Sequence, residues 1–353
     1  GDKDEARRTM KKAKVPVIPG SDILKDIKEV KIAAAKLGYP VLLKARSGGG
    51  GKGIRIVEQE SGLAPAYLSA SEEAKEAFGD GALYLEKYLT GVKHIEVQLL
   101  ADQNGKIIIL GDRDCSIQYK NQKLIEECPA PDLKQKIREQ MYEAARKAAA
   151  AVQYVSVGTI EFLLDGNHFY FMEMNTRLQV EHSVTEMVCG VDIVKWQIRT
   201  AAGCCISFEE TELKLEGHAI ECRICAANAV DFTPSCGEIQ ILHEPGGPNI
   251  RFDSALYQGC VIPPYYDSML GKLIVCSRSR ENAIRKMRSA LSELIIYGVE
   301  NNSEFHLRAI SEESFLEGTY STGFIKDTKL VSEQMECVKA GQDGKLNEFK
   351  RVV

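Results

Sequence analysis

The 353-residue sequence lacks the features of several specialised protein classes. No apolar run reaches the roughly 20 residues that a membrane-spanning helix needs. Residues 1–8 are mostly charged and do not resemble a signal peptide. The formal net charge of −5 gives no excess of positive charge for binding nucleic acid or an anionic membrane. We therefore expect a soluble protein with no nucleic-acid partner and no membrane partner.

The sequence also lacks a regular cysteine pattern, because its 11 cysteines are scattered without a repeating spacing. The chain is far longer than the small domains that depend on disulfides, so we expect reduced thiols and a cytoplasmic location. Cys222 and Cys225 form a CxxC pair, but no second pair lies at zinc-site spacing. Since a structural zinc ion takes four ligands, the pair gives little support for a zinc site.

Apolar residues make up 44% of the chain, enough for a sizeable core. Helical periodicity predicts a helix capped by Ser21 or Asp22, and a long helix over residues 132–153. A segment at residues 93–100 alternates as a strand, with His94, Glu96 and Gln98 on a polar face that can line a site. Further segments have the composition of strands: 39–45, 54–57, 82–88, 106–110, 155–164 and 169–174.

A glycine-rich segment, residues 46–53, joins two of these predicted strands. Gly48, Gly50 and Gly53 have the spacing of a dinucleotide-binding loop, but a β-branched strand follows them where that loop requires a helix. A Walker A loop is excluded because glycine, not Ser or Thr, follows Lys52. Bare backbone amides in such a hairpin can close over phosphate oxygens, with Lys52 and Lys44 adding charge. The alternative is a surface loop that binds nothing.

Two acidic residues flank a predicted turn at residues 165–168. A three-residue loop, 166–168, would place Glu161 directly opposite Glu173, with Asn175 on the same face, whereas a two-residue loop would separate the two acids. Adjacent carboxylates among apolar neighbours resist ionisation unless a cation lies between them. Magnesium takes carboxylate and amide oxygens of this kind, so the pattern predicts a magnesium site. The alternative is that both acids face solvent.

The segment at residues 175–182 carries Arg177, Gln179 and Glu181 at alternate positions, so an extended chain would direct them to one side. Arg177 can bind a planar anion such as bicarbonate through two hydrogen bonds. Gln179 can donate a further hydrogen bond, and Glu181 can accept a proton as general base. The alternative is a salt-bridged strand at the surface.

Four blocks, taken in order along the chain, resemble the biotin carboxylase family of the ATP-grasp superfamily, whose members serve carboxylases such as acetyl-CoA carboxylase. The blocks are residues 113–118 (RDCSIQ), 173–182 (EMNTRLQVEH), 221–224 (ECRI) and 263–269 (PPYYDSM). The resemblance implies an α+β chain with an ATP-grasp fold and a biotin carboxylase C-terminal domain. It implies a connecting helix at 1–15, a lid at 16–90, a catalytic subdomain at 91–205, the C-terminal domain at 206–328 and a tail at 329–353.

The same resemblance implies the reaction, which is ATP-dependent carboxylation of biotin by bicarbonate through carboxyphosphate, with Mg²⁺ or Mn²⁺. The implied ATP contacts are Lys3, Lys44, Gly48, Gly49, Gly50, Gly51, Lys52, Gly53, Glu86, Lys87, Leu89, His94, Gln118 and Asn121. The implied metal ligands are Glu161, Glu173 and Asn175. Bicarbonate and biotin would contact Lys123, Arg177, Gln179, Val180 and Arg223. The catalytic groups would be Glu181 as base, with Arg223, Arg177 and Lys123.

The sequence departs from the family pattern at single positions. Asn121 stands where histidine is usual, Ser183 where proline is usual, and Cys236 within an expected Pro-Ser-Pro-Gly turn. The chain also starts at the Gly-Asp-Lys that follows an amino-terminal domain in this family, and that domain normally completes the biotin pocket and the dimer interface. These departures put a nucleotide contact, unaided activity and oligomeric state in doubt, but leave the expected metal ligands, base and arginines in place.

The resemblance implies three partners: a biotin carboxyl carrier protein or domain, a carboxyltransferase and, at full length, a second copy in a homodimer. Two other functions stay open. One is another ATP-grasp ligase, such as half of a carbamoyl phosphate synthetase, against which Arg223 and the 263–269 block argue. The other is a nucleotide-binding scaffold without turnover.

Overall fold

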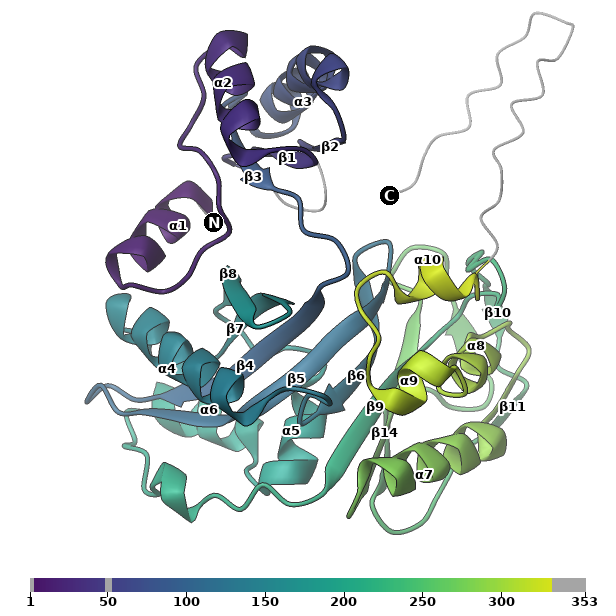
Figure 1. Cartoon of the computed structure of the whole chain (residues 1–353). Coiled ribbons are helices and arrows are strands. Elements are labelled where there is room, and N and C mark those ends of the chain that lie inside the picture. The colour runs from purple at the N-terminus through teal and green to yellow at the C-terminus, as the bar shows by residue number, and fades with distance from the viewer. Residues whose placement is uncertain (1–2, 48–52, 332–353) are drawn as a thin grey trace, which may run out of the picture.

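A computed structural model describes residues 3–47 and 53–331 of the chain. Its centre is an antiparallel sheet of eight strands in the order β12-β14-β9-β6-β5-β4-β7-β8 (Figure 1). These strands are β4 Lys93–Ala101, β5 Ile107–Tyr119, β6 Gln122–Cys128, β7 Ser156–Asp165, β8 His168–Asn175, β9 His218–Cys225, β12 Ile250–Ser254 and β14 Met269–Ser277. The strand predicted at residues 93–100 is therefore an inner strand of this sheet.

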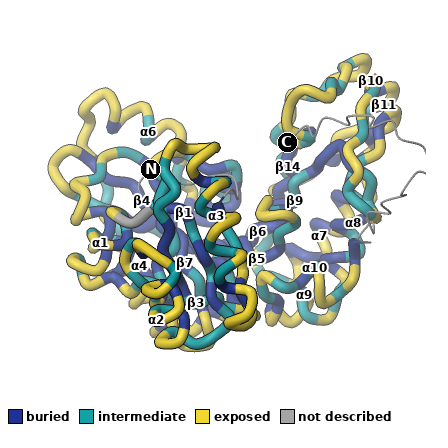
Figure 2. Tube along the Cα trace, turned by 90° about the horizontal axis from the view of Figure 1, so that it is seen from above, coloured by how far each residue is buried: buried dark blue, intermediate teal, exposed yellow. Residues whose placement is uncertain are grey.

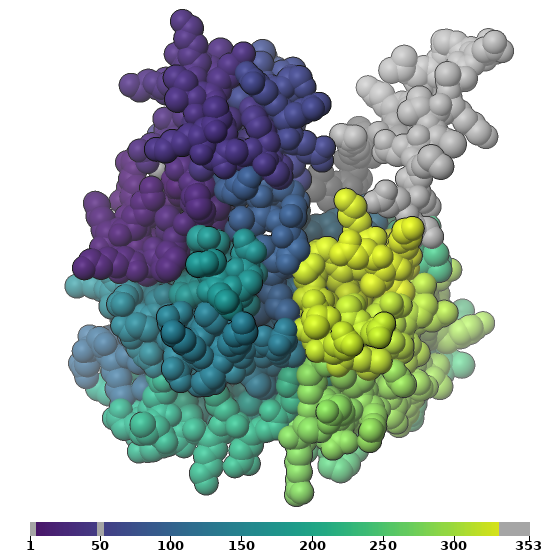
Figure 3. Space-filling model, viewed as in Figure 1, coloured from purple at the N-terminus to yellow at the C-terminus, as the bar shows by residue number. Residues whose placement is uncertain are grey.

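A second sheet, in the order β2-β1-β3, stands above the large sheet in Figure 1. Its strands are β1 Val41–Ala45, β2 Ile54–Val57 and β3 Leu83–Lys87, and the helices α2 (Ile27–Leu37) and α3 (Leu63–Phe78) share its core. The space-filling view shows this unit rising from the larger body (Figure 3). The glycine segment joins β1 to β2 as predicted. Residues 48–52 lie outside the described residues, so their role as a lid stays a prediction.

The two faces of the eight-stranded sheet differ because successive side chains of a strand point to opposite sides. On one face, Ile95, Val97 and Leu99 pack against α4 (Gln135–Ala151), and β9 and β14 pack against α7 (Arg280–Glu293). Figure 2 shows that buried residues follow the strands, whereas exposed residues follow the outer sides of helices and turns. This first face therefore supplies most of the hydrophobic core.

The opposite face of the sheet is polar near its centre and apolar where helices cover it. Val184 and Val188 of α5 (His182–Cys189) pack over β9 and β14, and Trp196 of α6 (Ile193–Ala201) packs over β4 and β7. Between these helices lie the buried polar side chains of several neighbouring strands. We call this part of the sheet the polar face.

The remaining elements extend the two ends of the chain. The first helix, α1 (Lys3–Lys12), contacts α4 and β8. In the small-sheet unit, η1 (Glu60–Gly62) precedes α3. Short elements complete the carboxyl-terminal part: η2 Glu210–Glu212, β10 Gly237–Glu238, β11 Ile241–His243, β13 Val261–Ile262, β15 Ile295–Tyr297, α8 Ser303–Ala309, α9 Glu313–Glu317 and α10 Phe324–Thr328. The boundary predicted at residue 206 does not interrupt the large sheet, because β9 pairs with β6. None of the described helices combines the length and apolarity needed to cross a membrane.

The predicted start of α2 is wrong. Asp26 is the N-cap, and its carboxylate accepts hydrogen bonds from the backbone N–H groups of Lys28 and Glu29 at 2.8 and 2.9 Å. Ser21 does not cap this helix, because its Oγ accepts a hydrogen bond from the backbone N–H of Leu85 at 2.9 Å and its own backbone N–H donates to the Leu85 carbonyl at 2.8 Å, which pairs residue 21 with β3. The residue that the local sequence favours as a cap, Ser21, is therefore used in a tertiary contact with β3.

The β7-β8 hairpin has the predicted pairing but not the predicted loop. Asp165 pairs with His168, so the turn contains two residues, and Gly166 at its first position has a φ of 57°. A β-bulge at Met172 then shifts the register, and Glu161 lies opposite Glu173. The extra residue of a bulge thus restores the pairing that a two-residue turn alone would remove.

Candidate active site

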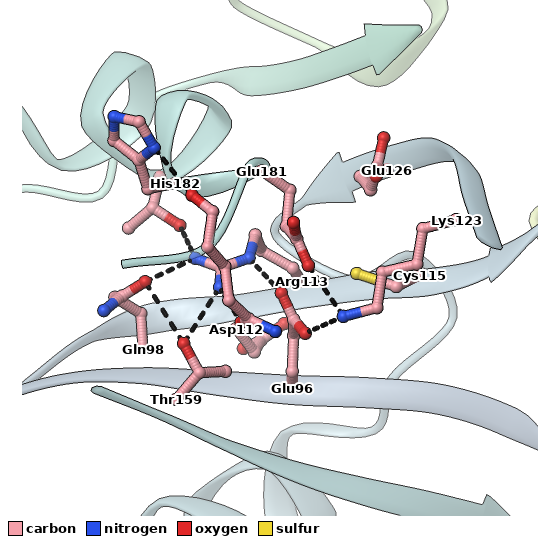
Figure 4. Close-up of polar contacts among 12 residues, drawn as sticks. Glu96, Gln98, Asp112, Arg113, Cys115, Lys123, Glu126, Thr159, Glu181 and His182 are labelled. Atoms are coloured by element: carbon pink, nitrogen blue, oxygen red, sulfur yellow. Dashed lines mark hydrogen bonds and ion pairs between the residues drawn. The ribbon is translucent and has the colours of Figure 1, made fainter. Parts of the chain in front are cut away.

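Lys123, on β6, lies at the centre of a buried carboxylate cluster on the polar face. Its Nζ donates to Glu96 at 2.6 Å, to Glu161 at 2.9 Å and to Glu181 at 2.6 Å. Figure 4 shows Lys123 reaching Glu96 and Glu181, which come from β4 and from the N-cap position of α5. Burial alone would lower the pKa of Lys123, but the surrounding carboxylates raise it well above its ordinary value. The lysine is therefore held as a cation.

Glu161, on β7, gathers the side chains expected around a metal and an anion. Asn175 Nδ2 and Gln179 Nε2 each donate to its Oε1 at 2.9 Å, and His94 Nε2 lies 3.0 Å from its Oε2. Burial raises the pKa of Glu161, but His94 and Lys123 outweigh this effect and lower it. The carboxylate is therefore ionised and suited to a cation.

Glu173 lies opposite Glu161 on the neighbouring strand, and its side chain is exposed. Together with Asn175, the two acids offer carboxylate and amide oxygens from adjacent strands. This is the donor chemistry that magnesium takes when nucleotide phosphates complete its shell. These donor atoms suit magnesium, and the assignment of the three residues as its ligands stays a prediction.

Arg223, on β9, joins Glu181 to a second buried carboxylate. Its Nη2 donates to Glu181 Oε2 at 2.8 Å, and its Nε donates to Glu126 Oε1 at 2.6 Å. Burial raises the pKa of Glu126 to about 7, although Arg223 opposes this shift. Because Lys123 holds the other oxygen of Glu181, both oxygens of the predicted base are engaged.

Arg113, on β5, is a structural centre of the site that the sequence did not predict. Its guanidinium is fully buried and donates to Glu96, to Gln98 at 2.8 Å, to Thr159 at 3.3 Å and to Gln179 at 3.2 Å (Figure 4). These partners come from three other segments of the chain, so no local motif reveals them. Arg113 opens the 113–118 block that carries the family resemblance, but the block gave this residue no role, and the polar triplet 112–114 after an apolar run indicates burial without naming the partners.

The predicted nucleotide contacts fall into two groups on the two sheets. In the small sheet, Lys44 Nζ donates to Glu86 at 2.6 Å, and Lys87 Nζ donates to the carbonyls of Gly38 and Tyr39. In the large sheet, His94 Nδ1 lies 2.7 Å from Gln118 Nε2. The half-buried Leu89 lies in the segment that connects the two sheets. A nucleotide that used all these residues would lie between the sheets.

The remaining predicted nucleotide residues lie in turns, at the start of α1 or outside the described residues. Gly53 has a φ of 70°, and its backbone N–H donates to Glu73 of α3 at 3.0 Å. Asn121 is exposed in the β5-β6 turn, with a φ of 65°. Asparagine tolerates this left-handed conformation well, which favours it at the turn. Lys3 is described only as the first residue of α1, and Gly48, Gly49, Gly50, Gly51 and Lys52 are outside the described residues.

Residues 175–182 do not form the extended chain that would direct Arg177, Gln179 and Glu181 to one side. β8 ends at Asn175, and a turn leads directly into α5. Gln179 and Glu181 are buried in the cluster, whereas Arg177 is exposed and donates to the carbonyl of Leu178 at 3.2 Å. Val180 contributes its carbonyl, which accepts a hydrogen bond from Lys272. Of the three alternating polar residues, Gln179 and Glu181 therefore lie in the cluster and Arg177 lies outside it.

Two family models together match most of the chain. The model described as the carbamoyl-phosphate synthase L chain, ATP binding domain, matches residues 2–208. The model described as the biotin carboxylase C-terminal domain matches residues 221–327. The first match contains Lys123, Glu161 and Glu181, and the second contains Arg223. The cluster therefore forms where the two matched regions meet.

Individual proteins show the same similarity. Biotin carboxylase 1 of Bacillus subtilis is 50% identical over 330 residues, which cover 92% of this chain and 73% of that protein. A crystal structure of biotin carboxylase from Campylobacter jejuni, in a β-γ-ATP complex, has a TM-score of 0.89 and 48% identity, covering 92% of this chain and 73% of that one. The biotin carboxylase domain dimer of Hydrogenobacter thermophilus 2-oxoglutarate carboxylase, in complex with MgADP, ADP and bicarbonate, has a TM-score of 0.87 and 47% identity, with coverages of 93% and 73%.

Proposed function

Because the chain belongs to the biotin carboxylase family, we propose that it catalyses ATP-dependent carboxylation of biotin with bicarbonate. The observation that carries the proposal is the cluster in which Lys123 and Arg223 hold the two oxygens of Glu181. One buried carboxylate between two cations provides a base next to groups that bind anions. This arrangement suits a small oxyanion substrate such as bicarbonate.

In the proposed first step, Glu181 removes the proton of bicarbonate, whose oxygen attacks the γ-phosphorus of ATP to form carboxyphosphate and ADP. Bicarbonate must displace one of the hydrogen bonds that Lys123 and Arg223 make to Glu181, and the displaced cation is then free to bind the anion. Lys123, Arg177, Gln179, Val180 and Arg223 are the groups we assign to bicarbonate and biotin. Among the described residues, the exposed guanidinium of Arg177 makes one hydrogen bond, to the carbonyl of Leu178, and no ion pair.

In the proposed second step, carboxyphosphate breaks down to carbon dioxide and phosphate. The released phosphate takes the proton of the ureido N–H of biotin, and the ureido nitrogen attacks the carbon dioxide. Arg223 stabilises the negative charge that develops on the ureido oxygen. Glu161, Glu173 and Asn175 would hold magnesium, which neutralises phosphate charge when it is bound. The glycine segment at residues 48–53 would contact ATP, together with Lys3, Lys44, Glu86, Lys87, Leu89, His94, Gln118 and Asn121.

The partners and the setting of this reaction are also proposals. A biotin carboxyl carrier would deliver biotin, and a carboxyltransferase would determine the final acceptor, for which acetyl-CoA is one candidate. We propose a homodimer, supported by the related domain dimer from Hydrogenobacter thermophilus. We also propose a cytoplasmic location, supported by the ten free thiols among the described residues.

The experiment that tests the function is bicarbonate-dependent ATP cleavage, measured with and without free biotin. We expect cleavage that requires bicarbonate and is stimulated by biotin. Dependence on ammonia would indicate a carbamoyl-phosphate-forming ligase instead. Tight ATP binding without cleavage would indicate a scaffold, and either result would reject the proposal.

An Arg223→Ala variant separates the two steps. We expect this variant to lose biotin carboxylation by about 100-fold or more, because the ureido oxyanion loses its donor. Slow bicarbonate-dependent ATP cleavage should persist, since Lys123 still holds Glu181. Carboxybiotin formation and ADP release are measured in parallel, and equal loss of both would contradict the role of Arg223.

A further inference from the structure

The turn that carries Glu181 is held by two buried cations that do not contact its carboxylate. We call residues 179–185 the base turn; it includes the start of α5. Lys272 of β14 donates through Nζ to the Val180 carbonyl and to Ser183 Oγ, each at 2.5 Å. Arg113 of β5 donates to Gln179 Oε1 at 3.2 Å and to Thr185 Oγ1 at 2.9 Å. The two cations therefore hold the turn on both sides of Glu181.

The location of Lys272 connects this support to the catalytic cluster. Lys272 lies directly opposite Arg223 in the β14-β9 ladder, so the two cations are neighbours on the polar face. Arg223 contacts the side chain of Glu181, while Lys272 contacts the backbone carbonyl of the residue before it. Asp253 Oδ2 lies 3.6 Å from Lys272 Nζ and accepts a hydrogen bond from Ser183 Oγ at 3.3 Å. The contact is therefore anchored on a third strand, β12.

The cations that contact the Glu181 carboxylate differ from those that contact the base turn in whether bound substrate competes with their partners. Lys123 and Arg223 hold the Glu181 carboxylate, and a bound oxyanion competes with that carboxylate for both. Lys272 and Arg113 bind a carbonyl, an amide oxygen and hydroxyls of the base turn, for which a bicarbonate ion in front of Glu181 does not compete. Both cations are buried, with Lys272 8% exposed and Arg113 fully enclosed.

We propose that Lys272 and Arg113 are positioning residues that keep Glu181 in place while substrate displaces Lys123 or Arg223 from its carboxylate. In this chain Ser183 completes the contact, because it supplies a hydroxyl where the family pattern has proline. Ser183 is fully buried, so its hydroxyl is available to Lys272 and Asp253 and not to solvent. The inference rests on the proposed role of Glu181 as base.

The test uses Lys272→Met, which removes the ammonium but retains side-chain length. Its matched control is Lys286→Met, because Lys286 also donates to two backbone carbonyls, those of Pro248 and Cys276, but does not contact the base turn. Hydrogen exchange of the backbone amides in residues 182–189 reports the order of α5. We expect exchange there to become about tenfold faster in Lys272→Met and to stay unchanged in the control. Equal exchange in the two variants would overturn the proposal.

Steady-state kinetics of bicarbonate-dependent ATP cleavage provide the second readout. A misplaced base lowers kcat by about 10- to 100-fold, whereas KM for ATP stays near its original value, because nucleotide contacts are untouched. Ser183→Ala should cause a smaller fall in kcat, since Lys272 keeps the Val180 carbonyl. A Lys272→Met variant with the kcat of Lys286→Met would overturn the proposal. Absence of activity in the unaltered chain would instead reject the proposed function, and hydrogen exchange would still decide whether Lys272 holds the turn.

Discussion

Glu161 is a single carboxylate on which the metal site and the anion site both depend. Lys123, His94, Asn175 and Gln179 all contact it, and they come from three different segments of the chain. Burial alone would raise the pKa of this carboxyl, and His94 and Lys123 outweigh that effect. The negative charge of Glu161 is therefore maintained by His94 and Lys123, which its carboxylate in turn holds in place.

A Glu161→Gln variant removes the negative charge that these four side chains contact but keeps nearly the same side-chain volume. We expect the magnesium concentration for half-maximal ATP cleavage to rise at least about tenfold, because one metal-binding carboxylate becomes a neutral amide. Titration of activity with magnesium measures this shift. Glu143→Gln, an exposed change of the same charge on α4, is the control and should leave the titration unchanged. An unaltered magnesium requirement in Glu161→Gln would reject the metal assignment.

Glu126 gives a pH dependence at the residue scale. Burial raises its pKa from 4.5 to about 7, so the folded protein binds this proton more tightly than the unfolded chain. The stabilising effect of the proton is complete below pH 4.5 and is lost as the pH rises through 7. Glutamine resembles the protonated form. Glu126→Gln should therefore gain about 1–3 kcal/mol relative to the unaltered protein between about pH 4.5 and 8, as measured by urea unfolding.

An exposed carboxyl provides the comparison for Glu126. Glu317→Gln should show a difference from the unaltered protein that does not change over the same pH range. A pH-independent difference for Glu126→Gln as well would show that the raised pKa of Glu126 is absent.

At the scale of the element, the sequence predicted strands and pairings better than helix starts and loops. Period-2 alternation identified β4 and its polar face, and β-branched composition identified β2. The cap of α2 was wrong because Ser21 pairs with β3, a contact that no local pattern contains. The predicted pairing of Glu161 with Glu173 is confirmed, but the predicted three-residue loop is wrong. The turn has two residues, and the extra residue of the bulge at Met172 restores the pairing.

The cap of α2 can be tested with a matched pair of acidic residues. Asp26→Ala should lower the free energy of unfolding by about 1 kcal/mol, because two backbone N–H groups lose their acceptor. Asp22→Ala removes the exposed acid that the sequence favoured and should change stability by less than about 0.5 kcal/mol. Thermal denaturation followed by circular dichroism measures both. Equal effects would contradict the assignment of Asp26 as the cap.

At the scale of the whole molecule, one sheet continues through both regions that the family models match. Glu127 of β6 fastens the carboxyl-terminal helices to this sheet. It accepts hydrogen bonds from Arg280 at 2.8 Å and from Tyr320 at 2.7 Å, and His218 Nε2 lies 2.6 Å away. Sequence reasoning could not find this network, because Arg280 and Tyr320 follow Glu127 by more than 150 residues.

Removing the charge of Glu127 should destabilise the entire fold. Burial raises its pKa, but hydrogen bonds from His218 and Arg280 lower it to about 2. We expect Glu127→Gln to lose about 2–4 kcal/mol of unfolding free energy at pH 7, because the half-buried guanidinium of Arg280 loses its carboxylate partner and keeps only the carbonyls of Phe315 and Leu316. Since the folded pKa is lowered, this loss should shrink as the pH falls from 4.5 towards 2.

Urea unfolding at several pH values measures the effect, and Glu317→Gln on the exposed side of α9 is the control for loss of one negative charge. A Glu127→Gln variant as stable as this control would show that the network does not fasten the helices to the sheet.

The adjacent residues Glu126 and Glu127 point to opposite sides of β6, one to Arg223 in the catalytic cluster and the other to Arg280 beneath the carboxyl-terminal helices. Inserting or deleting one residue upstream of them within β6 would exchange their sides, and chemistry and stability would fail together. Natural variation in chain length should therefore be tolerated at the exposed β5-β6 turn around Asn121 and excluded from the strand itself.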